Sequence, residues 1–422
     1  MKKLSLGFLG FGNIGVGVWT LINDMYDEIA TNNGVELDIK KILVKDINKE
    51  REVDVDKSLL TTNPDDVINN PEIDVVVEFL GGEQPAAEYM LRALKNGKTV
   101  VTANKMAFAL HWSALHNAAK ETKSGLYYEA AVCGAIPIIN AITESMQGNR
   151  IDHLYGIVNG TTNDILTRME KNGLSYEEAL KIAMDLGLAE PDPSSDVDGH
   201  DAAYKLSILA SLCFKTNVKY SDIYIEGISK ISKTDMEYAH NFGYRIKLLA
   251  IAKNDGGRIE ARVHPTFIPI EHPLANINGS MNSVFIHGHA CEDMMFMGRG
   301  AGSLPTASAV VSDIIRSTEH KSHVYPNFYN NGNFVVDENW ESAYYLRFAA
   351  KDTPGVLSKI SGCLGENNVS IQAMQQKGTS TNARVPVMFI THTACEKDIQ
   401  KAIKAISDDV ATLESMIRVE NL

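Results

Sequence analysis

The sequence has few cysteines and no stretch that is hydrophobic enough to span a membrane. Its five cysteines are odd in number, lie far apart and form no CxxC pair, so neither a disulfide framework nor a thiolate zinc site is predicted. No run approaches the roughly 18 apolar residues that a membrane span needs. The start, MKKLSLGFLGFG, leads directly into a glycine motif rather than a cleavage site. We therefore expect a whole, unprocessed protein of the reducing cytoplasm.

Positive charge is also scarce. The 53 acidic side chains outnumber the 40 basic ones, which gives a net charge of -13. This excess disfavours long-range attraction to nucleic acid or to an anionic membrane, although a local basic pocket for a phosphorylated small molecule is compatible with it. The 422 residues, of which 44% are hydrophobic, are enough for two or three domains with well-filled cores.

Apolar periodicity divides the chain into three parts. Over residues 1–130 short apolar strands alternate with helical stretches, which predicts an α/β fold with a mainly parallel sheet. Residues 131–304 start with helices and continue with β-rich segments, which indicates an α+β domain, and a helix in about 305–325 is expected to return to the first domain. After a linker at 325–342, residues 343–422 follow the order βαββαβ of a ferredoxin-like module and end in a short strand from Ile417 to Val419.

The first motif with chemical meaning is a glycine-rich turn between a predicted strand at residues 4–9 and a predicted helix at residues 13–29. Glycines let the chain turn sharply and let a pyrophosphate approach the free N–H groups that begin the helix. An ordinary glycine-rich turn is the alternative, but the strand–turn–helix context favours dinucleotide binding by a Rossmann-type, doubly wound parallel sheet. The turn consists of Gly10, Phe11, Gly12, Asn13, Ile14 and Gly15.

The charges after the second predicted strand bear on the choice of nicotinamide cofactor. An acidic side chain there would bind a ribose hydroxyl of NAD, and a basic one would pair with the 2′-phosphate of NADP. Lys45 comes first, with Lys49 and Arg51 nearby, and this favours NADP. Asp46 could still support NAD, and all four charges could instead be solvated loop residues.

Lys105 follows another predicted strand, in the segment VVTANK. Because the carboxyl ends of parallel strands form the ligand crevice, a lysine there could face cofactor and substrate together. A surface lysine is the commoner alternative. A second glycine loop, residues 298–305, opens a helix and could approach a phosphate or the nicotinamide through its backbone, or it could be a tight interdomain turn.

An acidic stretch from Glu190 to Lys205 carries the remaining candidate residues. It does not fit a calcium loop, because aligning Gly199 with the sixth position of an EF-hand puts Lys205 at the twelfth, where an acid is needed. Asp201 and Lys205 could form an ion pair on a helix surface, worth about 0.3–0.5 kcal/mol. Alternatively, Glu190 and Asp201 could hold a cationic amino group while Lys205 exchanges a proton with a hydroxyl or carbonyl oxygen. Spacing alone leaves both interpretations open.

Together these segments resemble the homoserine dehydrogenase family across almost the whole chain. The last part, with KDTPGVL at its first strand-to-helix turn, resembles an ACT domain, an amino-acid-sensing module found at the C-terminus of many bacterial members. The family resemblance is carried by the order and number of the motifs GFLGFGNIGVGV, VVEFLGG, VVTANK, YEAAVCGAIPII, GIVNGTTNDILT, LGLAEPDPSSDVDGHDAAYKL and GRGAGSLPTASAVVSDI.

The resemblance implies NAD(P)H-dependent interconversion of L-aspartate 4-semialdehyde and L-homoserine, on the route to threonine, methionine and isoleucine. It implies a homo-oligomer, either a dimer or a tetramer, and an ACT domain that carries inhibition by threonine. By the same resemblance Glu190 and Asp201 bind homoserine, Lys205 is the position usually assigned as the proton donor, and Lys105 is the other lysine implicated. The nicotinamide supplies the hydride chemistry, while the protein positions the reacting carbon and stabilises charge on the oxygen.

The resemblance also implies ligands for a structural monovalent cation such as sodium and further contacts to the cofactor. Oxygen ligands suit a hard cation. The cation would be bound by the Glu129 carboxylate and the backbone carbonyls of Val132, Gly134 and Ile136. The remaining positions that match cofactor contacts are Gly81, Lys105, Gly187 and Gly302.

Two residues depart from the family pattern. Cys133 replaces a glycine in the cation loop, and Asp164 stands where an aromatic residue is frequent, near the dimer sheet. Two other functions compete with the family's reaction. A non-catalytic nucleotide and amino-acid sensor would keep the fold without turnover, although retention of both lysines and both carboxylates argues against it. A phosphorylating semialdehyde dehydrogenase would need an activated cysteine, and Cys133, the only cysteine beside a matched active-region segment, has no adjacent base in the sequence.

Overall fold

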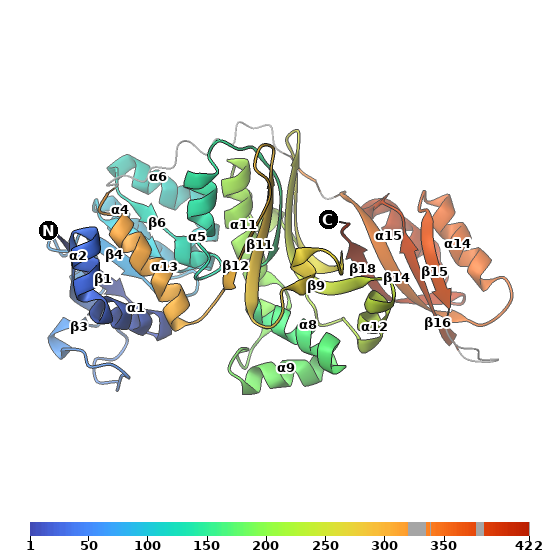
Figure 1. Cartoon of the computed structure of the whole chain (residues 1–422), viewed down its shortest axis with the longest axis horizontal. Coiled ribbons are helices and arrows are strands. Elements are labelled where there is room, and N and C mark those ends of the chain that lie inside the picture. Colours follow the sequence, from blue (N-terminus) through green and yellow to red (C-terminus); the bar gives the residue numbers. More distant parts are fainter. Residues whose placement is uncertain (320–334, 338, 377–383, 422) are drawn as a thin grey trace. The chain divides into compact units, whose positions relative to one another are not determined.

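The computed structural model describes residues 1–319, 335–337, 339–376 and 384–421. By its internal contacts the chain divides into two units, whose elements are labelled in Figure 1. Unit 1 consists of residues 1–158, 201–223 and 281–334, and unit 2 consists of residues 159–200, 224–280 and 335–422. Within the described part of the chain, no helix is long and apolar enough to cross a membrane.

A six-stranded parallel sheet forms the first part of unit 1, as the alternation of strands and helices predicts. Its strands lie in the order β3-β2-β1-β4-β5-β6. Strands β2 and β3 are added on one side of β1 and strands β4 to β6 on the other, and ligands bind at such a switch point in Rossmann-type sheets. The central strand β4 reads VVVE and is buried at every position, as expected for a parallel sheet covered on both faces. The strands are β1 (Lys2–Leu9), β2 (Val35–Leu43), β3 (Leu60–Thr61), β4 (Val75–Glu78), β5 (Thr99–Thr102) and β6 (Leu126–Tyr127).

The helices of this part connect successive strands. The helix predicted over residues 13–29 is in fact two helices, because Met25 adopts φ -111° and ψ 20°. Asp27 and Glu28 follow the break in the first turn of the next helix, where acidic side chains interact favourably with the exposed N–H groups. The helices are α1 (Asn13–Asp24), α2 (Tyr26–Asn33), α3 (Asp65–Ile68), α4 (Ala86–Lys95), α5 (Lys105–Leu110) and α6 (Trp112–Thr122).

Helix α13 (Ser303–Arg316) packs beside α1, far from it in sequence (Figure 1). The Ser303 hydroxyl donates to the backbone oxygen of Asn13 at 2.7 Å. A Cβ at Gly17 would lie 2.4 Å from the Ser303 hydroxyl oxygen, so the absence of a side chain on Gly17 permits this close approach. Apolar residues of α13 thereby join the core of the parallel sheet.

The second part of unit 1 is an antiparallel sheet of order β12-β11-β7 beside a buried helix. Helix α11 is apolar on most of its circumference, and its residues from 201 to 214 are all buried, as expected for a helix without a polar face. Its elements are η2 (Glu129–Ala131), α7 (Ile138–Asn140), the π-turn η3 (Ala141–Ser145), β7 (Ile151–Ile157), α11 (His200–Phe214), η4 (Tyr220–Asp222), β11 (Met281–Gly288) and β12 (Glu292–Arg299).

Unit 2 begins with helices and a long hairpin. Ser175 and Glu178 form a reciprocal capping box at the start of α9, an arrangement that satisfies two backbone donors at once. The elements are α8 (Gly160–Asn172), α9 (Tyr176–Asp185), α10 (Ser194–Val197), β8 (Tyr224–Ile225), α12 (Lys233–Asn241), β9 (Tyr244–Asp255), β10 (Arg258–Pro269), η5 (Pro273–Asn276) and β13 (Val335–Val336).

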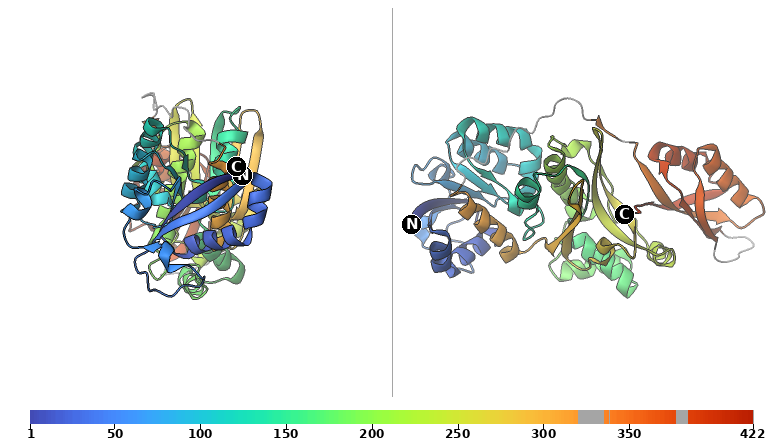
Figure 2. Two further views of the ribbon diagram at one scale, coloured as in Figure 1. Left: turned by 90° about the vertical axis from the view of Figure 1, so that its left-hand side faces the viewer. Right: turned by 45° about the horizontal axis from the view of Figure 1, so that its top comes forward.

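The C-terminal module of unit 2 has the predicted βαββαβ order. Its strands lie in the order β18-β14-β16-β15, and α14 and α15 pack side by side on one face of that sheet (Figure 2). Most of the predicted linker at 325–342 lies outside the described residues. The elements are β14 (Glu341–Lys351), α14 (Val356–Glu366), β15 (Ile371–Gln376), β16 (Arg384–Thr391), β17 (Ala394–Cys395), α15 (Glu396–Ala405) and β18 (Ala411–Val419).

The last strand differs from its prediction. It begins at Ala411 instead of Ile417, and its end pairs in parallel with β10, with Arg418 opposite Thr266. The sheets of the hairpin and of the C-terminal module are therefore continuous. Ladder hydrogen bonds between distant segments cannot be read from the local sequence, which explains the short prediction.

Candidate active site

Lys105 is fixed just beyond the carboxyl end of a strand of the parallel sheet. It is the first residue of α5, and the Asn104 side chain caps that helix by accepting from the Ala107 N–H at 3.0 Å, a common arrangement for an N-terminal asparagine. Strand β5 ends at Thr102. The lysine therefore occupies the edge of the sheet at which open α/β folds bind ligands.

Asp201 and Lys205 lie one turn apart on α11, and both are buried, with 6% and 10% of their side chains exposed. The Lys205 Nζ donates to Asp201 Oδ2 at 2.8 Å and to the backbone oxygen of Val158 at 2.7 Å. The pair is thus not a solvated surface pair. Burying two charges is costly unless each is paired and hydrogen-bonded, and both conditions hold here.

The structure brings Lys105 to the same carboxylate. Its Nζ lies 3.0 Å from Asp201 Oδ1, and the Lys105 side chain is 39% exposed. One buried carboxylate is therefore shared by two amines, one of which is accessible and one of which is not. Such a cluster can bind an ammonium group through the carboxylate and can donate a proton to an oxygen through a lysine.

Glu78 organises the residues around Lys105, and the sequence prediction missed it. It ends β4, is fully buried, and accepts hydrogen bonds from the Thr102 hydroxyl at 2.6 Å and the Leu80 N–H at 2.7 Å. The Asn104 side chain donates to it at 3.4 Å. Burial raises the pKa of this carboxyl. The only sequence signal was one acid at the end of an apolar strand, in VVEFLGG.

The glycine turn has room for a pyrophosphate. Gly10 has φ 103°, a conformation that favours glycine, and a Cβ at Gly15 would lie 3.2 Å from the Gly10 backbone oxygen. Gly12 caps the N-terminus of α1, and no atom lies within 4 Å of the place where its Cβ would stand. This open cradle at a helix N-terminus fits the anionic part of a dinucleotide.

In the segment after β2, Lys45 is exposed, whereas Asp46 and Arg51 form hydrogen bonds within the segment. Asp46 Oδ1 accepts from the Asn48 N–H at 2.8 Å. The Arg51 guanidinium donates to the backbone oxygens of Asp46 and Lys49, each at 2.7 Å. Lys45 is thus the exposed cation nearest to the end of the strand.

The other residues predicted to contact ligands are divided between the two units. Gly81 has φ 72°, and Gly302, with φ 119°, caps α13; both belong to unit 1. Gly187 has φ 69° and, like Glu190, is exposed in unit 2. The cluster that the structure itself brings together is Lys105, Asp201 and Lys205.

Glu129 lies in a pocket of buried negative charge. Its carboxylate accepts from the backbone N–H groups of Ile139 and Asn140, each at 2.8 Å, and its own N–H donates to Asp313 Oδ2 at 2.9 Å. Burial, reinforced by the Asp313 carboxylate, raises the pKa of Glu129 to about 8. Burial likewise raises the pKa of Asp313 to about 7. The Arg316 guanidinium, 3.8 Å from Asp313 Oδ1, offsets part of this charge, and carboxylate oxygens of this kind suit a hard cation.

The loop after Glu129 has a tight backbone. Cys133 and Gly134 have φ 56° and 50°, and a Cβ on Gly134 would lie 2.8 Å from the Gly300 backbone oxygen. Cys133 thus adopts a left-handed conformation that favours glycine. Its thiol is a poor nucleophile, because burial raises its pKa to about 11 and thiolate is the reactive form. This geometry argues against a phosphorylating semialdehyde dehydrogenase.

Asp164, the second departure, is buried on α8 in unit 2 and forms an ion pair with Arg168 at 2.6 Å. The arginine one turn away neutralises the unusual acid.

Comparisons with known proteins identify the family to which the chain is similar. The chain matches the family described as "Homoserine dehydrogenase" over residues 137–315, its NAD-binding domain over 10–129 and the ACT domain over 344–410. The homoserine dehydrogenase of Bacillus subtilis is 41% identical over 432 residues, which cover 100% of this chain and 99% of that protein. The chain belongs to the homoserine dehydrogenase family.

Solved structures of this family extend the match to three dimensions. A homoserine dehydrogenase from Thiobacillus denitrificans is 39% identical, with a TM-score of 0.91 and coverage of 100% of this chain and 99% of that one. A hyperthermophilic archaeal homoserine dehydrogenase in complex with NADPH is 27% identical, with a TM-score of 0.65 and coverage of 78% and 100%. The predicted resemblance and the predicted fold class, a Rossmann-type sheet with an α+β domain and an ACT domain, are confirmed. This member of the homoserine dehydrogenase family is an NAD(P)-dependent oxidoreductase that acts on a CH–OH group.

Proposed function

We propose that the chain interconverts L-aspartate 4-semialdehyde and L-homoserine with a nicotinamide cofactor, a step in the biosynthesis of threonine, methionine and isoleucine. The observation that carries the proposal is the buried cluster in which the Asp201 carboxylate lies 3.0 Å from Lys105 Nζ and 2.8 Å from Lys205 Nζ. The substrate has an ammonium group that needs a carboxylate and an oxygen that needs a proton, and the cluster offers both kinds of partner.

Each residue of the cluster has a distinct role in this proposal. Asp201, together with Glu190, binds the ammonium of the substrate. Lys205, whose Nζ is held by Val158 O and Asp201, donates a proton to the aldehyde oxygen in the reducing direction and recovers it in the oxidising direction. Lys105 stabilises negative charge on that oxygen from the accessible side. The bound nicotinamide supplies or accepts the hydride.

NADP is the preferred cofactor in this proposal, and NAD remains usable. The turn from Gly10 to Gly15 holds the pyrophosphate, and Gly81, Gly187 and Gly302 allow close approach of the backbone. Lys45, exposed after β2, pairs with the 2′-phosphate. A Lys45→Ala change should then lower kcat/KM with NADPH by roughly 10-fold, the order of one lost charged contact, and should leave the value with NADH unchanged. Equal losses with both cofactors would contradict the assignment.

A structural monovalent cation, such as sodium, is part of the proposal. The Glu129 carboxylate and the backbone carbonyls of Val132, Gly134 and Ile136 would hold it. The backbone N–H groups of Ile139 and Asn140 hold the Glu129 carboxylate in place at 2.8 Å, and oxygen ligands of this kind suit a hard cation. The ion has no role in the proposed proton or hydride transfer.

Threonine is proposed as the effector of the ACT domain. The turn KDTPGVL leads into α14 through Gly355, which has φ 88° and caps that helix. Such a glycine-containing turn before a helix exposes backbone N–H groups that can bind the carboxylate of an amino acid.

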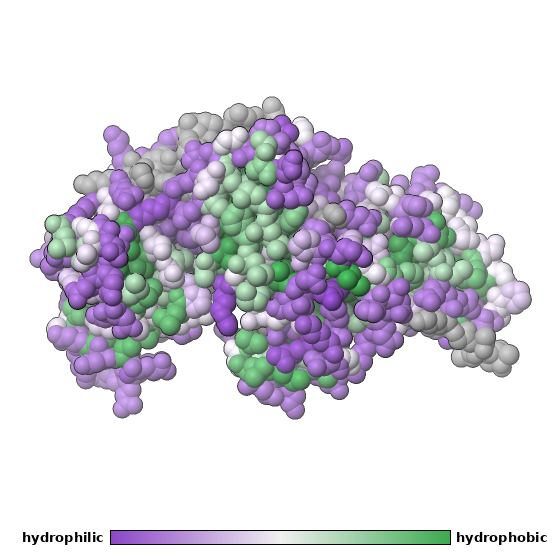
Figure 3. Space-filling model, in the orientation of Figure 1, coloured by the Kyte–Doolittle hydropathy of each residue, from purple (hydrophilic) through white to green (hydrophobic). Residues whose placement is uncertain are grey.

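We also place the protein in the cytoplasm as a homo-oligomer. An apolar surface lies over β11 and β12 (Figure 3), where Met295 and Met297 are 41% and 58% exposed. Exposed apolar patches of this kind are typical of surfaces that bind another protein. The dimer and the tetramer are distinguished by measuring the mass of the full chain in solution.

The activity is tested with Lys205→Ala. We expect cofactor affinity to be retained and kcat with homoserine to fall by roughly 10²–10⁴-fold, the usual contribution of a positioned acid or base. Lys41→Ala is the control, because Lys41 is a lysine of the same unit whose Nζ also donates to a backbone oxygen, that of Ser58. Unchanged turnover in Lys205→Ala would reject the role of Lys205. A natural chain without turnover would instead support the non-catalytic sensor, which the family match does not favour.

A further inference from the structure

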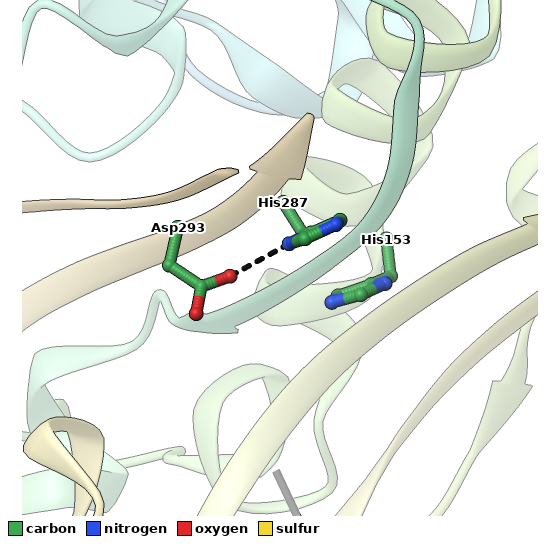
Figure 4. Close-up of side chains that lie close together, drawn as sticks. All are labelled: His153, His287 and Asp293. Carbon is green, nitrogen blue, oxygen red and sulfur yellow. Dashed lines mark hydrogen bonds and ion pairs between the residues drawn. The ribbon is translucent and has the colours of Figure 1, made fainter. Parts of the chain in front are cut away.

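Three side chains with metal-binding atoms form a row across the antiparallel sheet of unit 1. His153 lies on β7, His287 on β11 and Asp293 on β12. In the ladder His287 is directly opposite His153 on one side and Asp293 on the other. Residues that are paired in this way project from the same face of a sheet. Figure 4 shows His287 between the other two side chains.

The three groups are already close together. The rings of His153 and His287 are stacked, with centroids 4.7 Å apart and planes 6° from parallel. His287 Nδ1 lies 2.7 Å from Asp293 Oδ1, and one ligand atom from each of the three residues lies within 4.8 Å of the others. Ligand atoms of a tetrahedral zinc site lie about 3.3–3.5 Å apart, given metal–ligand bonds of about 2.0–2.1 Å. A small rotation of side chains that are partly exposed would close this difference.

The donor set selects the class of metal. Two imidazoles and one carboxylate suit borderline transition ions such as Zn²⁺, whereas sodium, magnesium and calcium prefer sets made of oxygen alone. The His287 and Asp293 side chains are 34% and 62% exposed, so water has access to complete the coordination. A surface ion pair would account for His287 and Asp293 alone. It gives no reason for a second imidazole stacked in the same row.

Two further polar side chains of this part of unit 1, Asp152 and His289, have local partners. The neighbouring Asp152 is engaged by Arg150, whose Nε donates to its carboxylate at 2.7 Å. The Arg150 N–H in turn donates to Nδ1 of His289 at 2.9 Å. Asp152 and His289 are therefore engaged by Arg150, and the proposed ligand set is the row of three.

We propose that His153, His287 and Asp293 bind one divalent transition-metal ion, with Zn²⁺ as the reference case. The ion would join three adjacent strands at one end of the face that carries Met295 and Met297. The site is separate from the oxygen ligands proposed for the monovalent cation and does not depend on the proposed enzymatic activity.

The test uses the full chain, freed of metal with a chelator, and adds Zn²⁺ or Co²⁺ without substrate or cofactor. Calorimetry with Zn²⁺ should give one equivalent per chain, and Co²⁺ should produce visible absorption bands of a site containing nitrogen ligands. His153→Ala and His287→Ala should each weaken binding by at least about 10-fold, since even the loss of an outer-shell partner costs 10–100-fold. Bound Zn²⁺ should also raise the thermal midpoint of the natural chain.

His111→Ala is the matched control. Nε2 of His111 lies 2.9 Å from Glu83 Oε1, so this pair has the same chemistry as His287 and Asp293 and differs in having no stacked histidine partner given by the ladder. Binding should be unchanged in this variant. If a histidine variant fails to fold, Asp293→Asn, at the most exposed of the three positions, provides the same test. The proposal is overturned if the natural chain shows no saturable binding, or if the row variants bind as tightly as His111→Ala.

Discussion

The Nζ of Lys105 lies 3.0 Å from Oδ1 of Asp201, although the two residues lie in the first turns of different helices, α5 and α11. The second oxygen of the same carboxylate is bonded to Lys205. Asp201 therefore fixes the positions of both lysines, and it is also the proposed partner of the substrate ammonium. Loss of its charge should affect both binding and turnover.

We expect Asp201→Asn to raise the KM for homoserine and to lower kcat, with kcat/KM reduced by roughly 10²-fold or more, because charge-assisted contacts and lysine positioning are lost together. Cofactor affinity, measured by nicotinamide fluorescence, should be unchanged. Asp192→Asn is the control, because Asp192 is an exposed acid of the same loop whose carboxylate accepts from Ser194. A kcat/KM for Asp201→Asn equal to that of this control would contradict the proposed role.

Asn104 provides a second prediction, since it links Lys105 to the sheet. It caps α5, and its Nδ2 donates to the Gly82 backbone oxygen at 2.8 Å. Asn104→Ala should destabilise the fold by about 1 kcal/mol, the usual cost of losing a cap, and should lower kcat as well. Asn104→Asp restores the acceptor for the cap but not the amide donor, which serves Gly82 and the buried Glu78. If Asn104→Asp recovers stability without recovering kcat, the donor bond positions Lys105; recovery of both would show that the cap alone matters.

The candidate site could be predicted in part because its groups lie at strand ends and one helical turn apart. A lysine after β5 and an acid one turn before a lysine on α11 are local patterns, and the structure places Lys105, Asp201 and Lys205 together. Their distances depend on packing between distant segments, so the sequence could not decide between a surface pair and a buried cluster. Glu78 gave almost no signal, because its role depends on hydrogen bonds to residues of another strand and loop.

The fold, too, was predictable where the sequence pattern is local and not where distant segments pair. Strand and helix periodicity predicted the parallel sheet, the βαββαβ module and a returning helix in about 305–325, which the structure places at Ser303–Arg316. It did not predict the pairing of β18 with β10 or the break at Met25, because neither a ladder between distant strands nor a local change of helix direction has a periodic signal. The row formed by His153, His287 and Asp293 could not be predicted from the sequence either, since only the register of the three strands brings these residues together.

An ion pair inside unit 2 links β14 of the C-terminal module to α12, and it allows a third prediction. Arg347 Nε donates to Asp235 at 2.9 Å, and Asp235 is fully buried. Arg347→Met should lower the free energy of unfolding by about 3–5 kcal/mol, because it leaves the buried Asp235 carboxylate with the neutral donors Ser232 and Tyr345 but without its cationic partner. Combining it with Asp235→Asn should recover much of the loss. Urea unfolding followed by circular dichroism measures both effects.

The exposed pair of Lys351 and Asp409 serves as the control, and Lys351→Met should change stability little. A similar small change in Arg347→Met would contradict the proposed contribution of the Arg347–Asp235 pair. Deleting the ACT domain is a poorer experiment, since it would also remove Glu420, which lies 2.6 Å from the buried Arg262 of β10. Point variants of the ACT domain are therefore the better test of threonine inhibition.

The final prediction concerns the dependence of stability on pH. His264 is fully buried on β10, and burial, with Arg418 and Arg262 nearby, holds its pKa well below 6.5. The geometry agrees, because Nε2 of His264 faces the Arg262 guanidinium at 3.2 Å and must be unprotonated to accept that hydrogen bond. The folded chain therefore keeps this histidine neutral, whereas the unfolded chain protonates it as the pH falls below about 6.5. The contribution of neutral His264 to the free energy of unfolding is therefore complete above that pH, and it decreases below it by up to about 1.4 kcal/mol per pH unit.

Urea midpoints measured between about pH 7.5 and 5.5 should show this decrease in the natural chain and a smaller decrease in His264→Gln. His392→Gln, at an exposed position of the same unit, should keep the slope of the natural chain, and an unchanged slope in His264→Gln would assign the effect to other groups.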